Sequence, residues 1–133
     1  MAMAGRVVLL TALPLAVESA RRAYQERVIY VSCSDSLLTA ERLSQLNMAR
    51  AMGSALVVGV CGTGAGKVPY EQRRKEALQI AAVTAVIDEA PGLPELTEKW
   101  LDAAKVDVVA VFTEEEKASL PRILRASSRV VKV

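Results

Sequence analysis

Six residues with hydroxyl, backbone amide or cationic groups follow apolar runs that begin at Val28, Ala55 and Val106. In a parallel sheet the carboxyl ends of such strands meet at one edge, and ligands bind there where the strand order reverses. Hydroxyls, free amides and cations at that edge are groups that bind phosphate. The sequence therefore predicts a phosphate- or nucleotide-binding crevice at the carboxyl ends of the strands that start at Val28 and Val106. The residues expected to line it are Ser34, Thr39, Arg42, Gly62, Lys67 and Thr113.

The chain contains no histidine, and this absence narrows the chemistry more than any other feature of its composition. It removes imidazole acid–base catalysis and metal sites built on histidine. A run of acidic residues, Glu114–Glu116, follows Thr113, which is a good helix N-cap. This spacing predicts a capping box with favourable charges at the helix start, and a carboxylate cluster for magnesium is the alternative. We expect no catalytic residue and no metal site.

A glycine-rich segment, residues 61–68, lies between an apolar strand and a helix expected to start at Pro69. That setting is typical of phosphate-binding loops. Their spacing, however, requires glycine where Cys61 stands and serine or threonine where Val68 stands. The alternatives are a flexible loop of the kind found at active sites, with Lys67 as its cation, and a solvated connector.

The segment from residue 28 to residue 60 is the unit around which the chain is organised. Val28–Val31 and Ala55–Val60 are apolar, β-prone runs, as buried parallel strands require. Between them we expect a helix that begins near Ser36 and ends at Gly53, with Gly53 in the left-handed conformation. The buried stripe of this helix is expected to contain Leu38, Leu46, Ala49 and Met52. Strand, helix and strand in this length predict a right-handed parallel unit.

Alternation of strands and helices continues along the rest of the chain. The expected strands are Arg6–Thr11, Thr84–Ile87, Val106–Phe112 and Arg129–Val133. The expected helices are Leu13–Glu26, Pro69–Ala81, Pro94–Ala104 and a segment after Thr113 that Pro121 kinks or splits. Leu96, Trp100 and Leu101 are expected to point into the core. The sequence therefore predicts an α/β, three-layer Rossmann-like domain with a five- or six-stranded parallel sheet.

The composition fits one domain in a reducing compartment. With 133 residues, 52% of them hydrophobic, the chain is long enough to bury a sizeable core. The net charge of +2 gives no argument for nucleic acid or for a membrane surface. Cys33 and Cys61 are too few for a disulfide framework and are expected to be small buried residues, with a redox or ligand role as the alternative. These features favour an intracellular location, either the cytoplasm or an organelle matrix.

The first residues are expected to be an addition to the main domain. Arg6 and the apolar residues 7–17 have some similarity to a signal peptide, but Pro14 and Glu18 interrupt that pattern. No apolar run reaches the roughly 18 residues that a membrane span requires. We expect residues 1–26 to be a strand–helix addition, either at the sheet edge or over a partner-binding face. Residues 27–133 are then the main α/β domain.

Residues 27–133 resemble the cytidylyltransferase family, whose enzymes join CTP to phosphorylated alcohols. That family carries Gly-x-Phe-Asp-Leu-Leu-His-x-Gly-His, then a helix, then Gly-Asp and a Leu-Val-Val-Gly-Val strand. Leu37 and Leu38 match its Leu-Leu, Gly53 matches its glycine, and Leu56–Val60 matches its strand, with no gap between them. The His-x-Gly-His position reads Thr39, Ala40, Glu41 and Arg42.

The resemblance also implies a role for a helix residue. Tyr70–Arg73 is similar to the family's Tyr-Glu-His-Arg segment, in which the arginine helps to hold the nucleotide. The resemblance therefore implies Arg73 as a nucleotide-binding residue, and a charged residue on an exposed helix face is the alternative. Lys67 lies in the segment where the family has a mobile loop that contains lysine. The family's Arg-Thr-Glu-Gly-Ile-Ser-Thr segment, which binds phosphates, has no counterpart in this sequence.

Three functions are compatible with these residues. We expect a non-catalytic nucleotidyltransferase-like domain that acts as a structural or interaction subunit of a larger assembly, because the imidazoles and the phosphate-binding segment are missing. The alternatives are a nucleotide-binding regulatory module that uses Arg42, Lys67 and Arg73, and an active transferase that joins a nucleotide to a phospho-alcohol. The expected partners are other protein subunits, with a homodimer as one such assembly, and no cofactor is expected beyond weak nucleotide or phosphate binding.

Overall fold

The computed structural model describes residues 7–8, for which only the backbone is described, and residues 27–62 and 68–133. The predicted strand Arg6–Thr11 is therefore described only as β1, Val7–Val8. The predicted helix Leu13–Glu26 and the predicted site residue Lys67 lie outside the described residues.

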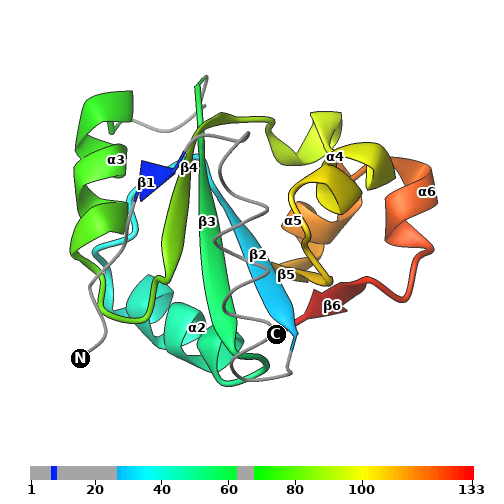
Figure 1. Ribbon diagram of the computed structural model, residues 1–133, viewed down its shortest axis with the longest axis horizontal. Helices are drawn as coiled ribbons and strands as arrows, with labels where there is room; N and C mark the ends of the chain where they lie inside the picture. The colour runs from blue at the N-terminus through cyan, green and yellow to red at the C-terminus, as the bar shows by residue number, and fades with distance from the viewer. Residues whose placement is uncertain (1–6, 9–26, 63–67) are drawn as a thin grey trace.

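Parallel strands form a six-stranded sheet in the order β1-β4-β3-β2-β5-β6 (Figure 1). After β1, the strands are β2 (Val28–Cys33), β3 (Ala55–Cys61), β4 (Ala85–Ala90), β5 (Val108–Val111) and β6 (Val130–Lys132). Every residue of β3 and β5 is buried, because helices cover both faces of the sheet. β1 pairs with β4 and is the edge strand on that side of the sheet. The predicted parallel α/β fold is confirmed.

The two faces of the sheet carry different sets of helices. Alternate residues of a strand point to opposite faces, so Ile29 and Val31 pack in one core cluster and Val28 and Tyr30 in the other. The first cluster also contains residues of α2 (Ala40–Arg50) and α3 (Tyr70–Gln79). The second lies beneath η1 (Leu93–Glu95), α4 (Glu98–Ala103), α5 (Glu114–Ser119) and α6 (Arg122–Arg125), which occupy the right of Figure 1. Two helical layers therefore enclose the sheet.

Threonine and proline residues divide the segments around α4 and α5. The predicted helix Pro94–Ala104 is two elements, η1 and α4, because the Thr97 hydroxyl accepts a hydrogen bond from Trp100 N at 3.1 Å and starts a new helix. Leu96 and Leu101 are fully buried and Trp100 packs against them, as predicted. Pro121 separates α5 from α6, which confirms the predicted split.

Helix α2 begins at Ala40, and the predicted start near Ser36 is wrong. The buried Glu76 carboxylate accepts a hydrogen bond from Leu37 N at 2.9 Å, so residue 37 is held in a loop and the helix starts only after Thr39. Leu38, which precedes the helix, is therefore exposed rather than part of the buried stripe. Leu46 and Ala49 are buried and Met52 is partly buried, as predicted.

Gly53 does not adopt the predicted left-handed conformation. α2 ends at Arg50, and a turn follows in which Met52 N donates to Ala49 O. Glycine is needed at position 53 for a different reason. The carbonyl of Arg27 passes so close to its α-carbon that a side chain would collide with that backbone.

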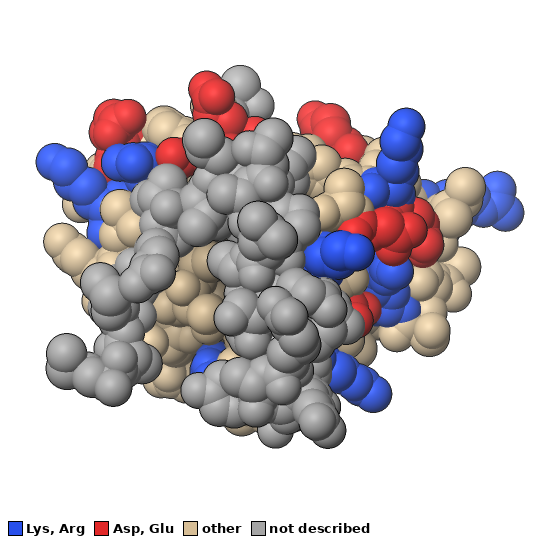
Figure 2. All heavy atoms as spheres, viewed as in Figure 1, with Lys and Arg blue, Asp and Glu red and all other residues tan. Residues whose placement is uncertain are grey.

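Ion pairs join the last strand to the helices before it. Arg129 Nη2 lies 2.8 Å from Asp102 Oδ1, and Lys132 Nζ lies 3.0 Å from Glu114 Oε1. Figure 2 shows basic and acidic side chains next to one another over this part of the molecule. Because these pairs are largely exposed, water and salt screen them and each stabilises the fold only weakly.

Candidate functional site

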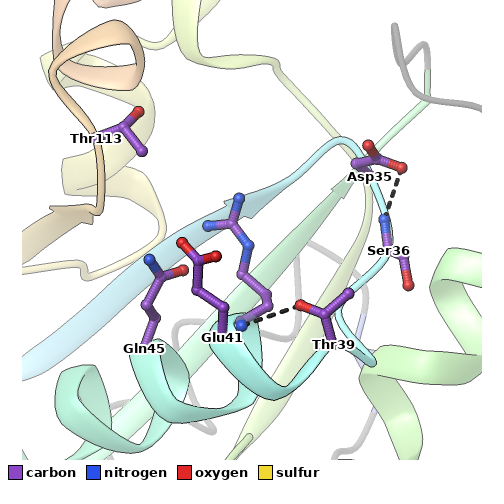
Figure 3. A pocket seen from close by; sticks show the side chains of 7 residues that line it. Asp35, Ser36, Thr39, Glu41, Gln45 and Thr113 are labelled. Carbon is purple, nitrogen blue, oxygen red and sulfur yellow. Dashed lines mark hydrogen bonds between the residues drawn. The ribbon is translucent and has the colours of Figure 1, made fainter.

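The order of the strands reverses between β2 and β5. From β2 the chain passes through β3 to β4 in one direction, whereas β5 and β6 lie on the other side of β2. An open pocket of about 230 Å³ lies at the carboxyl ends of these two strands (Figure 3). Its lining residues are Asp35, Ser36, Thr39, Glu41, Arg42, Gln45 and Thr113. The pocket thus brings together three of the predicted site residues, namely Thr39, Arg42 and Thr113.

Thr39 is the N-cap of α2. Its hydroxyl oxygen accepts a hydrogen bond from Arg42 N at 3.1 Å, which is drawn as a dashed line in Figure 3. The hydroxyl thereby satisfies one of the free amides at the start of the helix. The Thr39 side chain is therefore engaged in holding the helix end.

Arg42 connects α2 to α5 across the pocket. Its Nη1 and Nη2 atoms each lie 3.4 Å from Glu116 Oε2, and its guanidinium carbon lies 5.2 Å from the centre of the Phe112 ring. The arginine is thus held by a carboxylate and by the face of an aromatic ring, both of which attract a cation. Among the described residues that line the pocket, it is the only cation.

Thr113 and Glu116 cap the start of α5. The Thr113 hydroxyl accepts from Glu116 N at 3.0 Å, and Glu116 Oε1 accepts from Phe112 N at 2.7 Å. The predicted capping role is therefore confirmed, although the return bond reaches Phe112 rather than Thr113. One oxygen of Glu116 thus caps the helix while the other contacts Arg42.

Negative charge lines the other side of Arg42. Glu41 lies in the first turn of α2, and Asp35 lies in the loop before it, where Asp35 Oδ1 accepts from Ser36 N at 2.8 Å. Figure 3 shows Glu41 and Gln45 on α2, with Thr113 across the pocket from them. Together with Arg42, these residues give a pocket with two lining carboxylates and one guanidinium. The two carboxylates therefore oppose the binding of an anion, and a cation that accompanied the anion would reduce this repulsion.

Arg73 does not line this pocket. It is buried, and its Nη1 donates to the carbonyl oxygens of Cys33 and Cys61, at 3.0 Å each, while its Nε donates to Val68 O at 3.2 Å. The alternative of an exposed helix face is therefore wrong. The guanidinium joins the carboxyl ends of β2 and β3 to α3.

Glu76 is a buried residue of α3 that the sequence analysis did not identify. Its Oε1 accepts from Leu37 N at 2.9 Å and from the Ser36 hydroxyl at 3.0 Å, which fixes the loop that precedes α2. The sequence did contain a signal for it. Arg73, Glu76 and Ala77 recur at the spacing of one helical stripe, and this is the stripe that faces the sheet.

The other predicted site residues are not in the pocket. Ser34 and Gly62 are exposed and are not among its lining residues. Gly62 lies beside Glu89, whose φ of 50° places it in the left-handed region. Tyr70 stabilises this part of β4, where the pairing with β3 is irregular, because its hydroxyl donates to Asp88 Oδ1 at 3.2 Å and accepts from Glu89 N at 3.0 Å. These contacts lie at the ends of β3 and β4, away from the strand-order reversal.

Both cysteines are free and buried at the ends of their strands, as predicted. Cys33 belongs to the core beneath α2 and α3, whereas the Cys61 thiol lies 3.2 Å from the Ser32 hydroxyl. Burial raises the pKa of the Cys33 thiol from 9.0 to about 11, although the nearby Arg73 guanidinium acts in the opposite direction. Cys33 therefore carries little of the reactive thiolate near neutral pH.

The described residues contain neither a cluster of metal ligands nor a helix that could cross a membrane. Within residues 27–62 and 68–133, no three histidine, cysteine or acidic side chains come together as a metal site would require. None of the helices in the part of the chain that the structure describes is long and apolar enough to span a bilayer.

Comparison with known proteins gives a structural likeness only. No protein-family model and no curated protein matches this sequence significantly. A solved structure titled as the lipopolysaccharide core biosynthesis protein of Thermoplasma volcanium GSS1 is similar, with a TM-score of 0.57 and 16% sequence identity. The similarity covers 81% of this chain and 96% of that one. At this identity the likeness shows that the two chains share a three-layer α/β fold.

Proposed function

We propose that this chain is a nucleotidyltransferase-like domain that does not transfer nucleotides and serves as a structural or interaction subunit. The observation that carries the proposal is the set of charged groups that line the pocket at the strand-order reversal. Among the described residues that line it, the one cation, Arg42, is paired with Glu116, and the carboxylates of Asp35 and Glu41 line the same pocket. In the cytidylyltransferases that the sequence resembles, this position holds two histidines.

Catalysis would require groups that this pocket lacks. Phosphoryl chemistry depends on donors that strengthen their grip as charge develops in the transition state, and removing one such donor costs about 10²–10³ in rate. Thr39 is short, neutral and engaged in capping α2. The Arg42 guanidinium already contacts the Glu116 carboxylate. The loss of both imidazoles supports a domain without turnover.

A nucleotide-binding regulatory module is the second candidate. It is supported by the convergence of Thr39, Arg42 and Thr113 on one pocket at a helix N-terminus, where anions bind in many α/β proteins. In this candidate the nucleotide would bind without reacting. Weak binding of phosphate or nucleotide is the measurable difference from the first candidate.

Isothermal titration separates the two candidates. CTP and ATP are titrated into the protein with and without magnesium, because the metal would screen Asp35 and Glu41. The proposal of a structural subunit expects no heat beyond dilution with either nucleotide. Saturable binding that Arg42→Gln abolishes would favour the nucleotide-binding module instead.

Exposed apolar side chains support the interaction role. Ile123 on α6 is 78% exposed, and Leu38 and Met48 are each 47% exposed. Single exposed apolar residues are common on protein surfaces, so the test must show association. Sedimentation velocity over a range of concentrations should reveal a dimer of the wild type that Ile123→Lys weakens, if a second copy is the partner. A monomer at every concentration would exclude the homodimer.

A further inference from the structure

We infer that Glu116 is an internal competitor that weakens the binding of a phosphate to Arg42 in the pocket at the strand-order reversal. The inference rests on the proposed function, in which the domain holds no nucleotide, and names a residue that opposes such binding. It goes further because it assigns the weak phosphate binding to one residue, Glu116. This residue lies in α5 and not in the segment Thr39–Arg42, which stands where the resembling family has His-x-Gly-His.

The geometry places the Glu116 carboxylate where a ligand oxygen would otherwise sit. A phosphate oxygen bound across the end of the Arg42 guanidinium would contact Nη1 and Nη2 together, and Glu116 Oε2 already contacts both atoms at 3.4 Å. The guanidinium carbon also lies 5.2 Å from the centre of the Phe112 ring. A phosphate that binds through these two nitrogen atoms must therefore displace the carboxylate first.

The carboxylate is also fixed in place by the fold. Glu116 Oε1 accepts from Phe112 N at 2.7 Å, a short bond that keeps the side chain turned back over the start of α5. The carboxylate is therefore already ordered when it pairs with Arg42, which lowers the cost in side-chain entropy of that contact. This arrangement makes the internal carboxylate a strong competitor for a weak external anion.

The contact is nevertheless reversible. The side chains of Arg42 and Glu116 are 27% and 24% exposed, so each can return to water when the pair opens. Exposed pairs of this kind contribute about 0.2–1 kcal/mol. Loss of the competitor should therefore tighten phosphate binding about two- to fivefold.

Glu116→Gln isolates this competition. The glutamine oxygen can still accept from Phe112 N, so the cap remains while the charge that holds Arg42 is removed. Glu115→Gln is the matched control, because it makes the same charge change one residue away on an exposed side chain. Inorganic phosphate is titrated into each protein, and binding is followed by the backbone amide NMR signals of residues 39–42.

Glu116→Gln should bind phosphate about two- to fivefold more tightly than both the wild type and Glu115→Gln. The double variant Glu116→Gln, Arg42→Gln should lose this gain. Equal affinities of Glu116→Gln and Glu115→Gln, or a gain that survives in the double variant, would overturn the inference. Glu116→Asp serves as a second variant if the glutamine variant does not fold, because the shorter carboxylate withdraws from Arg42 and should also bind phosphate more tightly.

The phosphate titrations and a measurement of turnover test different claims. Turnover by the wild type would contradict the absence of catalysis whatever the phosphate affinities are. Identical phosphate affinities would contradict only the assignment of Glu116.

Discussion

The hydroxyl of Tyr30 lies directly against the α-carbon of Gly59 on the neighbouring strand, so that a side chain at position 59 would collide with it. Tyr30 is fully buried, its ring packs edge-on against Trp100 with 5.2 Å between ring centres, and its hydroxyl has no hydrogen-bond partner in the described structure. Gly59 is thus required by the large side chain that β2 places over β3.

Gly59→Ala should destabilise the protein by about 1–3 kcal/mol, because the added methyl group overpacks a closed core. Urea unfolding measures this change. Gly62→Ala is the control, since the nearest atoms to a side chain there are 4.0 Å away, and its effect should be within about 0.5 kcal/mol.

Tyr30→Phe should partly restore Gly59→Ala, because it removes the atom nearest to the new methyl group. Alone it should cost little, since the lost hydroxyl has no partner among the described residues. The two substitutions should therefore be coupled by about 1 kcal/mol. Strict additivity of the two changes would show that the Tyr30 hydroxyl is not the atom that excludes a side chain at position 59, and would assign the exclusion to Tyr30 Cζ and Ala90 Cβ, which both lie 2.7 Å from the added carbon.

Glu76→Ala should loosen the loop before α2. It leaves the Leu37 amide without its carboxylate acceptor, which costs about 1–3 kcal/mol for a buried donor. The amide of Leu37 should then exchange with solvent faster than in the wild type, as hydrogen exchange followed by NMR would show. Glu71→Ala, an exposed residue of the same helix, is the control and should leave that amide protected. Unchanged protection of Leu37 in Glu76→Ala would contradict the assigned role.

Cys33 should make the protein less stable at alkaline pH. Its pKa is raised from 9.0 to about 11 in the folded protein, so the unfolded chain loses the thiol proton at a lower pH than the folded protein does. The unfolded state then binds fewer protons, and the free energy of unfolding falls as the pH rises through this interval. The raised pKa of Cys33 therefore contributes about 2–3 kcal/mol to the free energy of unfolding below the pKa of the unfolded thiol, and this contribution is lost as the pH rises to about 11.

Cys33→Ala removes that contribution. Urea unfolding of wild type and variant should show a steeper loss of stability for the wild type between pH 9 and about pH 11, and parallel behaviour below pH 9. Parallel curves over the whole range would mean that the folded and unfolded thiols titrate alike.

The sheet was predictable because its strands are continuous apolar runs, which only a sheet covered on both faces explains. Val28–Cys33 and Ala55–Cys61 follow directly from such runs. The start of α2 was not predictable, since it depends on a bond from Leu37 to Glu76, 39 residues away in the sequence. Local cap residues alone favoured the earlier start at Ser36.

The candidate site was predictable in its position but not in its electrostatics. Thr39, Arg42 and Thr113 meet where parallel topology requires. The carboxylate that pairs with Arg42 belongs to Glu116, which is 74 residues away in the sequence. No local pattern indicates that these two side chains meet. The burial of Arg73 could have been inferred, because Glu76, Ala77 and Ile80 follow it at helical spacing and are all buried.

The proposal that this chain does not transfer nucleotides is tested most directly by a coupled assay for pyrophosphate. Wild type, Arg42→Ala and the triple variant Thr39→His, Glu41→Gly, Arg42→His are each incubated with CTP or ATP, magnesium and phospho-alcohols such as glycerol 3-phosphate. The triple variant introduces the residues that the resembling cytidylyltransferases have at these positions. It shows whether these residues alone give turnover. We expect no pyrophosphate from the wild type above the blank without protein. Clear wild-type turnover that falls in Arg42→Ala would contradict this and would make Arg42 a catalytic residue.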